Sequence, residues 1–285
     1  MVKNNDIHNL NILTIYSTIA YVFAYLIVFL SYNIITALVG KFYDIQTILI
    51  HNKLLFITSD YSDLWNPDSA FYVFASGTLF LGIATFTFLT FYKRYQYREE
   101  IKKIFLFWIT LHCINRALGS FIVGTTFHLY LSNVILYWLY VEYWIRIIMC
   151  ISVSLLLFFF GSLTTKPLLL STKSFTFVEK IKRHFFVLSQ GIYPWFFSSI
   201  IIFLIHLPRH AYSENFLSFT MLILILPSYF NHQDIEISFP EIADKIENEI
   251  EYEEPAYKIP WKYIISILLF ITLFRTVLAI GIAFY

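Results

Sequence analysis

The sequence carries little charge: Asp, Glu, Lys and Arg make up 14% of its 285 residues, whereas hydrophobic residues make up 58%. Soluble domains carry about 25% charged residues, so this composition excludes an ordinary soluble domain. With 20 basic and 19 acidic residues, the net charge of +1 provides no field that would attract nucleic acid. The composition therefore indicates an integral membrane protein with no nucleic-acid partner.

Cysteines and enzyme motifs are equally scarce. Cys113 and Cys150 both lie in apolar runs, which excludes a disulfide framework and a CxxC metal pair. The sequence has no HExxH, no GxxxxGK[ST], no GxSxG and no run of intramembrane acids of the kind that proton-coupled carriers need. We therefore predict no catalytic residue, no metal site and no cofactor, and we favour a non-enzymatic role.

Long hydrophobic runs, by contrast, are abundant. A transmembrane helix needs about 20 mostly apolar residues, and six stretches have that length: 12–39, 69–92, 102–124, 143–163, 188–207 and 261–285. A seventh, 216–230, would be about 22 Å long at 1.5 Å per residue and contains Pro227, so it either spans a thinned bilayer or is re-entrant. The prediction is an all-α, polytopic transmembrane helical bundle of about seven spans, forming one integral membrane domain over residues 1–285.

Basic residues are distributed unevenly among the connections, and this predicts orientation. The connections 93–103 and 164–184 contain five Lys or Arg residues each, whereas 125–142 has none and 208–215 has only Arg209. Because basic connections stay in the cytoplasm or its equivalent, we expect these two connections and the N-terminus on that side. Segment 40–68 is then external. The C-terminus is external too, unless 216–230 fails to cross.

Two connecting segments have a character of their own. Residues 44–58, within the external loop 40–68, are β-branched and aromatic on both sides of a polar centre and predict a β-hairpin. The loop 231–260 is acidic, with nine acids and one basic residue over 234–254. A capping box and an isoleucine every fourth residue predict a short amphipathic helix there. We interpret it as a docking element for a basic partner, with a solvated linker as the equal alternative; its predicted contact residues are Ile242, Ile246, Glu247, Ile250 and Glu251.

Arginines inside the predicted spans are the best functional candidates, because each costs about 2.5–3.5 kcal/mol on insertion scales. Arg146 lies four residues after Glu142, which predicts an ion pair along one helix. A shared polar centre is predicted from His112, Asn115, Arg116 and Arg275. The alternative is that each arginine reaches the interface or caps a neighbouring helix end.

One histidine cluster is a weaker lead. His206, His210 and Glu214 are spaced four residues apart, which would place them on one helical face and suit a metal. Pro208 interrupts that helix. We therefore interpret this segment as a solvated external loop without a metal.

The order of features over residues 12–125 resembles that of site-2-protease-like intramembrane metalloproteases. The features are the apolar stretch 28–40 (VFLSYNIITALVG), the hairpin, the Ser76-Gly77 step and the polar patch 115–124. The positions that match the family's zinc motif are Val28, Phe29 and Tyr32, which neither bind zinc nor activate water. The resemblance implies a catalytically inactive relative.

The sequence has many features that favour helix packing and few residues that could perform chemistry. It therefore predicts a non-catalytic subunit or scaffold of a membrane complex, with membrane lipids and other membrane subunits as partners. The alternatives are a small transporter or lipid-binding protein that uses the arginine centre, and an inactive site-2-protease-like protein. We expect a bacterial inner membrane, with the mitochondrial inner membrane as the alternative.

Overall fold

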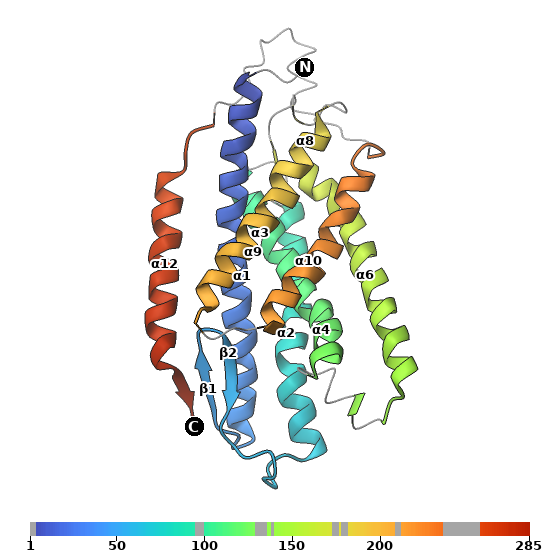
Figure 1. Ribbon diagram of the computed structural model, residues 1–285, viewed down its shortest axis with the longest axis vertical. Helices are drawn as coiled ribbons and strands as arrows, with labels where there is room; N and C mark the ends of the chain where they lie inside the picture. Colours follow the sequence, from blue (N-terminus) through green and yellow to red (C-terminus); the bar gives the residue numbers. More distant parts are fainter. Residues whose placement is uncertain are drawn as a thin grey trace.

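The computed structural model describes residues 4–94, 100–128, 136–137, 140–172, 177, 182–208, 212–235 and 257–285. These residues form an elongated bundle of helices with a small sheet at one end (Figure 1), as the all-α prediction requires. The helices are α1 (Asn4–Phe42), α2 (Pro67–Arg94), α3 (Glu100–Ile114), α4 (Ser120–Phe127), α6 (Tyr143–Leu169), α8 (Arg183–Val187), α9 (Tyr193–His206), α10 (Tyr212–Asn231) and α12 (Trp261–Ile280). Two π-helical turns, η1 (Asn115–Gly119) and η2 (Leu188–Ile192), join α3 to α4 and α8 to α9.

Six helical segments in the described part of the chain are long and apolar enough to cross a membrane. They are Ile7–Phe42, Pro67–Phe91, Ile101–Phe127, Tyr143–Leu169, Arg183–His206 and Trp261–Ile280, which correspond to the six long runs of the sequence. Helix α10 is not among them, because its first and last turns are rich in Ser, Asn and other polar residues. A seventh crossing by α10 therefore stays a prediction.

The predicted hairpin is present, and it has an unexpected third strand. Strands β1 (Thr47–Ile50) and β2 (Lys53–Phe56) pair antiparallel around the turn His51–Asn52. Strand β3 (Ile282–Phe284) pairs antiparallel with β1 on its other edge. The prediction of helix through residue 285 was wrong for this segment: α12 ends at Ile280, and Gly281, at φ +87°, turns the chain into the strand.

The connections gather at opposite ends of the bundle. At one end, the Lys103 ammonium donates to the Leu170 carbonyl at 3.2 Å and so joins the two connections that are rich in basic residues. We call this the basic end, and α1 begins there too (Figure 1). The sheet and the C-terminus lie at the opposite, hairpin end. The structure therefore places the C-terminus beside segment 40–68, whichever way α10 meets the bilayer.

The end of α10 is fixed at the basic end. Arg183 donates to the carbonyls of His232 at 3.1 Å and Ile235 at 2.7 Å. Burial lowers the pKa of His232 and so favours its neutral ring, whose Nδ1–H can donate to the Tyr229 carbonyl, 2.6 Å away. The acidic loop thus leaves the bundle from the basic end.

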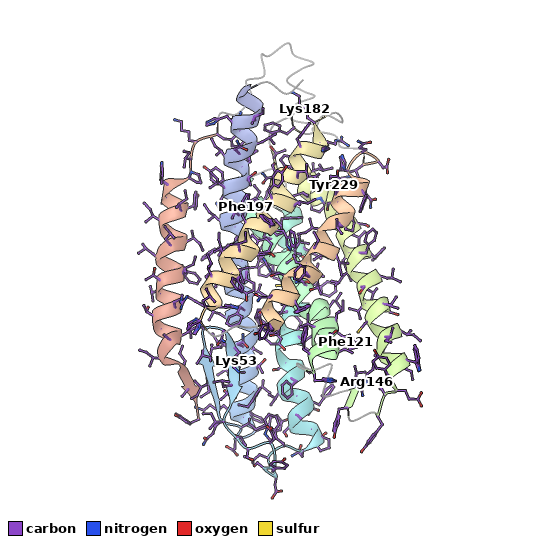
Figure 2. The ribbon with its side chains drawn as sticks, in the orientation of Figure 1. Lys53, Phe121, Arg146, Lys182, Phe197 and Tyr229 are labelled. Carbon is purple, nitrogen blue, oxygen red and sulfur yellow. The ribbon has the colours of Figure 1, made fainter. Side chains whose placement is uncertain are left out.

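The interior is packed around α1. Tyr21 and Phe29 of α1 and Trp108 of α3 are among the largest fully buried side chains. The Trp108 indole donates to the Ser17 hydroxyl at 2.7 Å, so the buried nitrogen has a partner. Side chains fill the space between the ribbons (Figure 2). This packing holds α3 and its π-turn against α1, where the polar residues meet.

Candidate functional site: a buried polar centre

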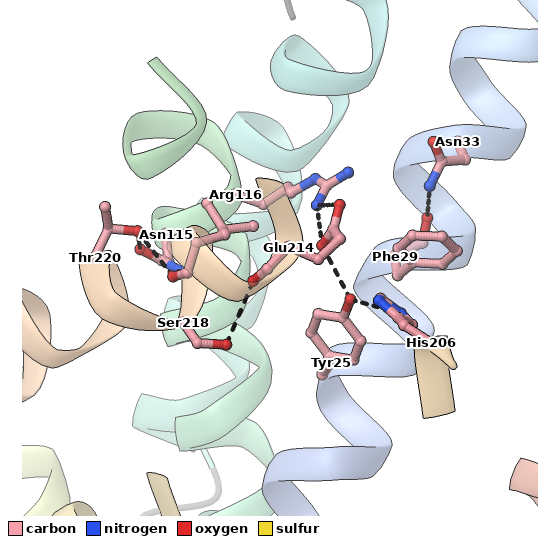
Figure 3. A network of polar contacts seen from close by, with 10 residues as sticks. Tyr25, Phe29, Asn33, Asn115, Arg116, His206, Glu214, Ser218 and Thr220 are labelled. Carbon is pink, nitrogen blue, oxygen red and sulfur yellow. Dashed lines mark hydrogen bonds and ion pairs between the residues drawn. The ribbon is translucent and has the colours of Figure 1, made fainter. Parts of the chain in front are cut away.

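The π-turn η1 carries the most polar patch of the predicted spans. A π-turn inserts one residue into the helical repeat and often occurs at functional sites. Asn115, the first residue of η1, donates from Nδ2 to the Leu217 carbonyl of α10 at 2.8 Å. The Thr220 hydroxyl lies 2.8 Å from Asn115 Oδ1. These contacts fix η1 against α10 (Figure 3).

Arg116 follows in η1 and pairs with Glu214 of α10. Its Nη1 lies 2.5 Å from Oε1 and 2.6 Å from Oε2 of the carboxylate, and the two side chains are 4% and 3% exposed. The guanidinium carbon also lies 4.5 Å from the centre of the Tyr32 ring, a cation–π distance. Glu214 lies in the first turn of α10, where the helix dipole favours an acid. The arginine charge is therefore neutralised inside the chain.

Tyr25 links this pair to His206 at the end of α9. Its hydroxyl lies 2.9 Å from Glu214 Oε2 and 3.2 Å from His206 Nε2 (Figure 3). A carboxylate only accepts, so the Tyr25 proton goes to Glu214, and the Tyr25 oxygen accepts from Nε2–H of His206. The chain of donors runs from His206 through Tyr25 to Glu214. This arrangement requires a proton on Nε2 of His206.

His112 completes the surroundings of the centre. It is buried, and its ring centre lies 4.4 Å from that of Tyr21. Its Nε2 has no hydrogen-bond partner among the described residues. Together with Arg116 and Glu214 it lines a cavity of about 10 Å³, which is no larger than one water molecule needs. In this conformation the centre has no room for a metabolite.

Arg275 does not join this centre. Its guanidinium donates to the carbonyls of Leu204 at 3.2 Å and Leu207 at 2.7 Å, where α9 ends. The last carbonyls of a helix have no partner within it, and an arginine is a favourable cap for them. Arg275 thus caps a neighbouring helix end, as the alternative interpretation expected. His112, Asn115 and Arg116, by contrast, do lie together and line the same cavity. Arg275 therefore lies at the end of α9 and is not hydrogen-bonded to the other three predicted residues.

Arg146 also has other partners than predicted. Its Nε donates to the Val141 carbonyl at 2.9 Å, and Nη2 lies 3.4 Å from the Leu136 carbonyl. Glu142, the N-cap residue of α6, meets Arg146 through the backbone hydrogen bond from the Arg146 amide to its carbonyl, at 3.2 Å. The guanidinium turns back toward the chain that precedes α6. The expected side-chain ion pair with Glu142 is replaced by hydrogen bonds to carbonyls.

Sequence reasoning missed Glu214, Tyr25 and His206 as members of the centre. It placed Glu214 in an external connection, although an acid in the first turn of an apolar helix is a recognisable signal. The pairing itself needs two segments 98 positions apart to meet, which no local pattern reveals. Among the described residues, no three His, Cys, Asp or Glu side chains are grouped to hold a metal; His210 lies outside those residues.

The predicted docking residues Ile242, Ile246, Glu247, Ile250 and Glu251 also lie outside the described residues. The positions that match the zinc motif of site-2-protease-like enzymes do lie near the centre: Val28 and Phe29 line the cavity, and Tyr32 faces Arg116. Comparisons with protein families, with curated proteins and with solved structures gave no match. The geometry therefore has to support a function by itself.

Proposed function

We propose that the protein is a non-catalytic subunit or scaffold of a membrane complex, in a bacterial inner membrane or, alternatively, the mitochondrial inner membrane. The observation that carries this proposal is the closed polar centre. Arg116 is neutralised by Glu214 within the chain, and the adjoining cavity is about 10 Å³. Groups arranged in this way specify how helices pack. They offer no open site for a substrate.

The outer faces of the bundle support the same proposal. In the most apolar window of α6, and in that of α12, only 17% of the residues are buried within the chain; for α2 the share is 22%. Large aliphatic and aromatic side chains cover these faces, among them Leu155 and Phe159 of α6 and Leu269 of α12. Such faces suit lipid and the helices of other membrane subunits. The faces available for partners are therefore extensive, whereas the interior is closed.

The alternative of a transporter or lipid-binding protein that uses the arginine centre has less support. It requires Arg116 to leave Glu214 and the cavity to open. Breaking a buried pair leaves an uncompensated charge, which costs about 3–5 kcal/mol. A ligand at this position would have to supply that free energy.

Purification in a mild detergent, with identification of co-eluting chains by mass spectrometry, tests the proposal. We expect at least one membrane protein to co-elute in a fixed ratio and to be lost in a harsher detergent before this chain unfolds. A matched purification of an unrelated polytopic protein from the same membranes controls for abundant contaminants. Recovery as a lone monomer under all mild conditions would contradict the proposal.

A further inference from the structure

A slot lies between α1 and α9 on the outside of the bundle. Its volume is about 490 Å³, and it is open to the outside. The two helices pack against each other along its edge, and Phe197 marks its α9 wall (Figure 2). Its lining comes from Asn11, Thr14, Ile15, Thr18 and Ile19 of α1 and from Tyr193 and Phe197 of α9.

The residues beside the slot indicate how deep it lies in the membrane. The Tyr16 hydroxyl donates to the Lys258 carbonyl at 3.1 Å, and the Tyr16 and Tyr263 rings meet at 6.2 Å. Tyr and Trp residues gather at the membrane–water interface, and Trp261 begins the apolar helix α12 beside them. This part of α1 therefore lies at the interface on the basic end. The slot begins there and continues into the apolar layer.

The lining of the slot becomes less polar from the basic end toward the apolar layer. Asn11 lies toward the N-terminus of α1 and is exposed, whereas Ile19, two turns further on, lies deeper in the bundle. On α9, Tyr193 is the first residue and Phe197 follows one turn deeper. The Thr14 and Thr18 hydroxyls donate to the Leu10 and Thr14 carbonyls of their own helix, so they present small, satisfied surfaces. The mouth is polar, and the interior suits a hydrocarbon chain.

Two lysines lie near Tyr16, which neighbours the slot residue Ile15 on α1. Lys258 and Lys262 are exposed and flank the start of α12, next to Tyr16. Lysines at this level attract the phosphate of membrane lipids. A phospholipid with its phosphate near these lysines and one acyl chain along Ile15, Ile19 and Phe197 matches both the charge and the polarity gradient. We propose that the slot is a binding site for one phospholipid of the leaflet at the basic end.

The first experiment fills the slot. We compare the wild type with the double variant Ile15→Trp/Thr18→Phe and with the control Ile151→Trp, on an exposed face of α6. Native mass spectrometry after a delipidating detergent wash should find about one phospholipid retained per chain in the wild type and in the control, and several-fold less in the double variant. Equal retention by the double variant, or none by the wild type, would overturn the site.

The second experiment identifies the occupant in the membrane itself. A photoreactive benzoylphenylalanine in place of Ile15 should form an adduct with the mass of a phospholipid. An adduct with another protein chain would instead assign the slot to a partner helix and overturn the proposal. Lys258→Gln/Lys262→Gln should lower retention of phosphatidylglycerol several-fold; unchanged retention would overturn the position of the phosphate.

This inference is independent of the proposed function, and the two can fail separately. The double variant Ile15→Trp/Thr18→Phe is expected to keep its co-eluting chains while it loses the lipid. Loss of both would contradict a site for lipid alone, because it would place a partner chain at the same surface.

Discussion

At the scale of single residues, Arg116 and Glu214 carry the buried charges of the interior. Both side chains are almost fully buried, and each supplies the countercharge of the other. Two ions lose several kcal/mol each when they leave water, and they regain it only when paired in good geometry. The pair is therefore costly to break, but it can be replaced by apolar side chains.

A double-mutant cycle at this pair is the first prediction. Arg116→Met and Glu214→Leu should each destabilise the protein by about 3–5 kcal/mol, because each leaves one buried charge without its partner. The double variant Arg116→Met/Glu214→Leu should recover most of that loss. Thermal unfolding in detergent measures all three. Additive losses in the double variant would show that the two residues do not act as a pair.

Tyr25 gives a milder prediction at the same scale. Tyr25→Phe removes the hydroxyl between His206 and Glu214 and leaves the ring in place. We expect a loss of about 1–3 kcal/mol, because one buried donor loses its acceptor and a carboxylate loses a donor. Tyr263→Phe, at the exposed interface, is the control and should change the melting temperature little.

Some residues of the centre could be predicted from the sequence, and others could not. His112, Asn115 and Arg116 are close together in the chain, so their clustering was visible as a polar patch in an apolar run. Glu214 and Tyr25 join from α10 and α1 through tertiary contacts. Arg275 is a single arginine in an apolar run, and nothing near it in the sequence indicated its partner. Only the end of α9, placed by the fold, shows that Arg275 is a cap.

At the scale of elements, α6 packs closely against α10, and Gly161 lies in that contact. A Cβ atom on Gly161 would lie only 2.1 Å from the Leu224 carbonyl oxygen, a backbone atom. A methyl group at this position would therefore force the two helices apart. Small residues at such crossings let transmembrane helices approach closely.

Gly161→Ala is the corresponding prediction. We expect it to destabilise the protein by about 1–3 kcal/mol through overpacking. Gly82→Ala is the matched control: nothing lies within 4 Å of the position of its Cβ, so the variant should be neutral or slightly more stable. Detergent melting curves compare the two. Equal effects would mean that the α6–α10 spacing adjusts freely.

The helices were largely predictable, because the length of each apolar run determines whether it can form a spanning helix. The long runs gave the spanning helices, and the β-branched residues around His51 gave the hairpin. The third strand was not predictable, because Ile282–Phe284 continues an apolar helix in sequence and becomes a strand only against β1. The π-turns were missed for a similar reason: contacts with α10 hold η1 in place.

Orientation belongs to the scale of the whole molecule. The basic connections lie at one end, and the sheet lies with the C-terminus at the other. We predict that a membrane-impermeant maleimide added to intact cells labels a cysteine at Asp63 and not one at Lys166, two exposed positions at opposite ends. Permeabilised cells should show labelling of both. Labelling at Lys166 alone would reverse the orientation.

The acidic loop gives a prediction at the same scale. The loop begins after α10 at the basic end, beside Arg183. We expect acids on the cytoplasmic side to be repelled by anionic head groups and so to be available to a basic partner. Replacing Glu247, Glu249, Glu251 and Glu253 by Gln should slow partner association and flatten its salt dependence. If wild type and variant associate equally at low and high salt, the loop is only a linker.

The central claim is that the buried charges serve packing and that the protein acts by holding partner chains. The most direct measurement is the yield of co-eluting chains from the folded double variant Arg116→Met/Glu214→Leu, expressed in place of the wild type. The account predicts the same partners in the same ratio as for the wild type, because the outer faces are unchanged. A double variant that is stably folded and yet has lost its partners would contradict it, since the pair would then act in more than packing.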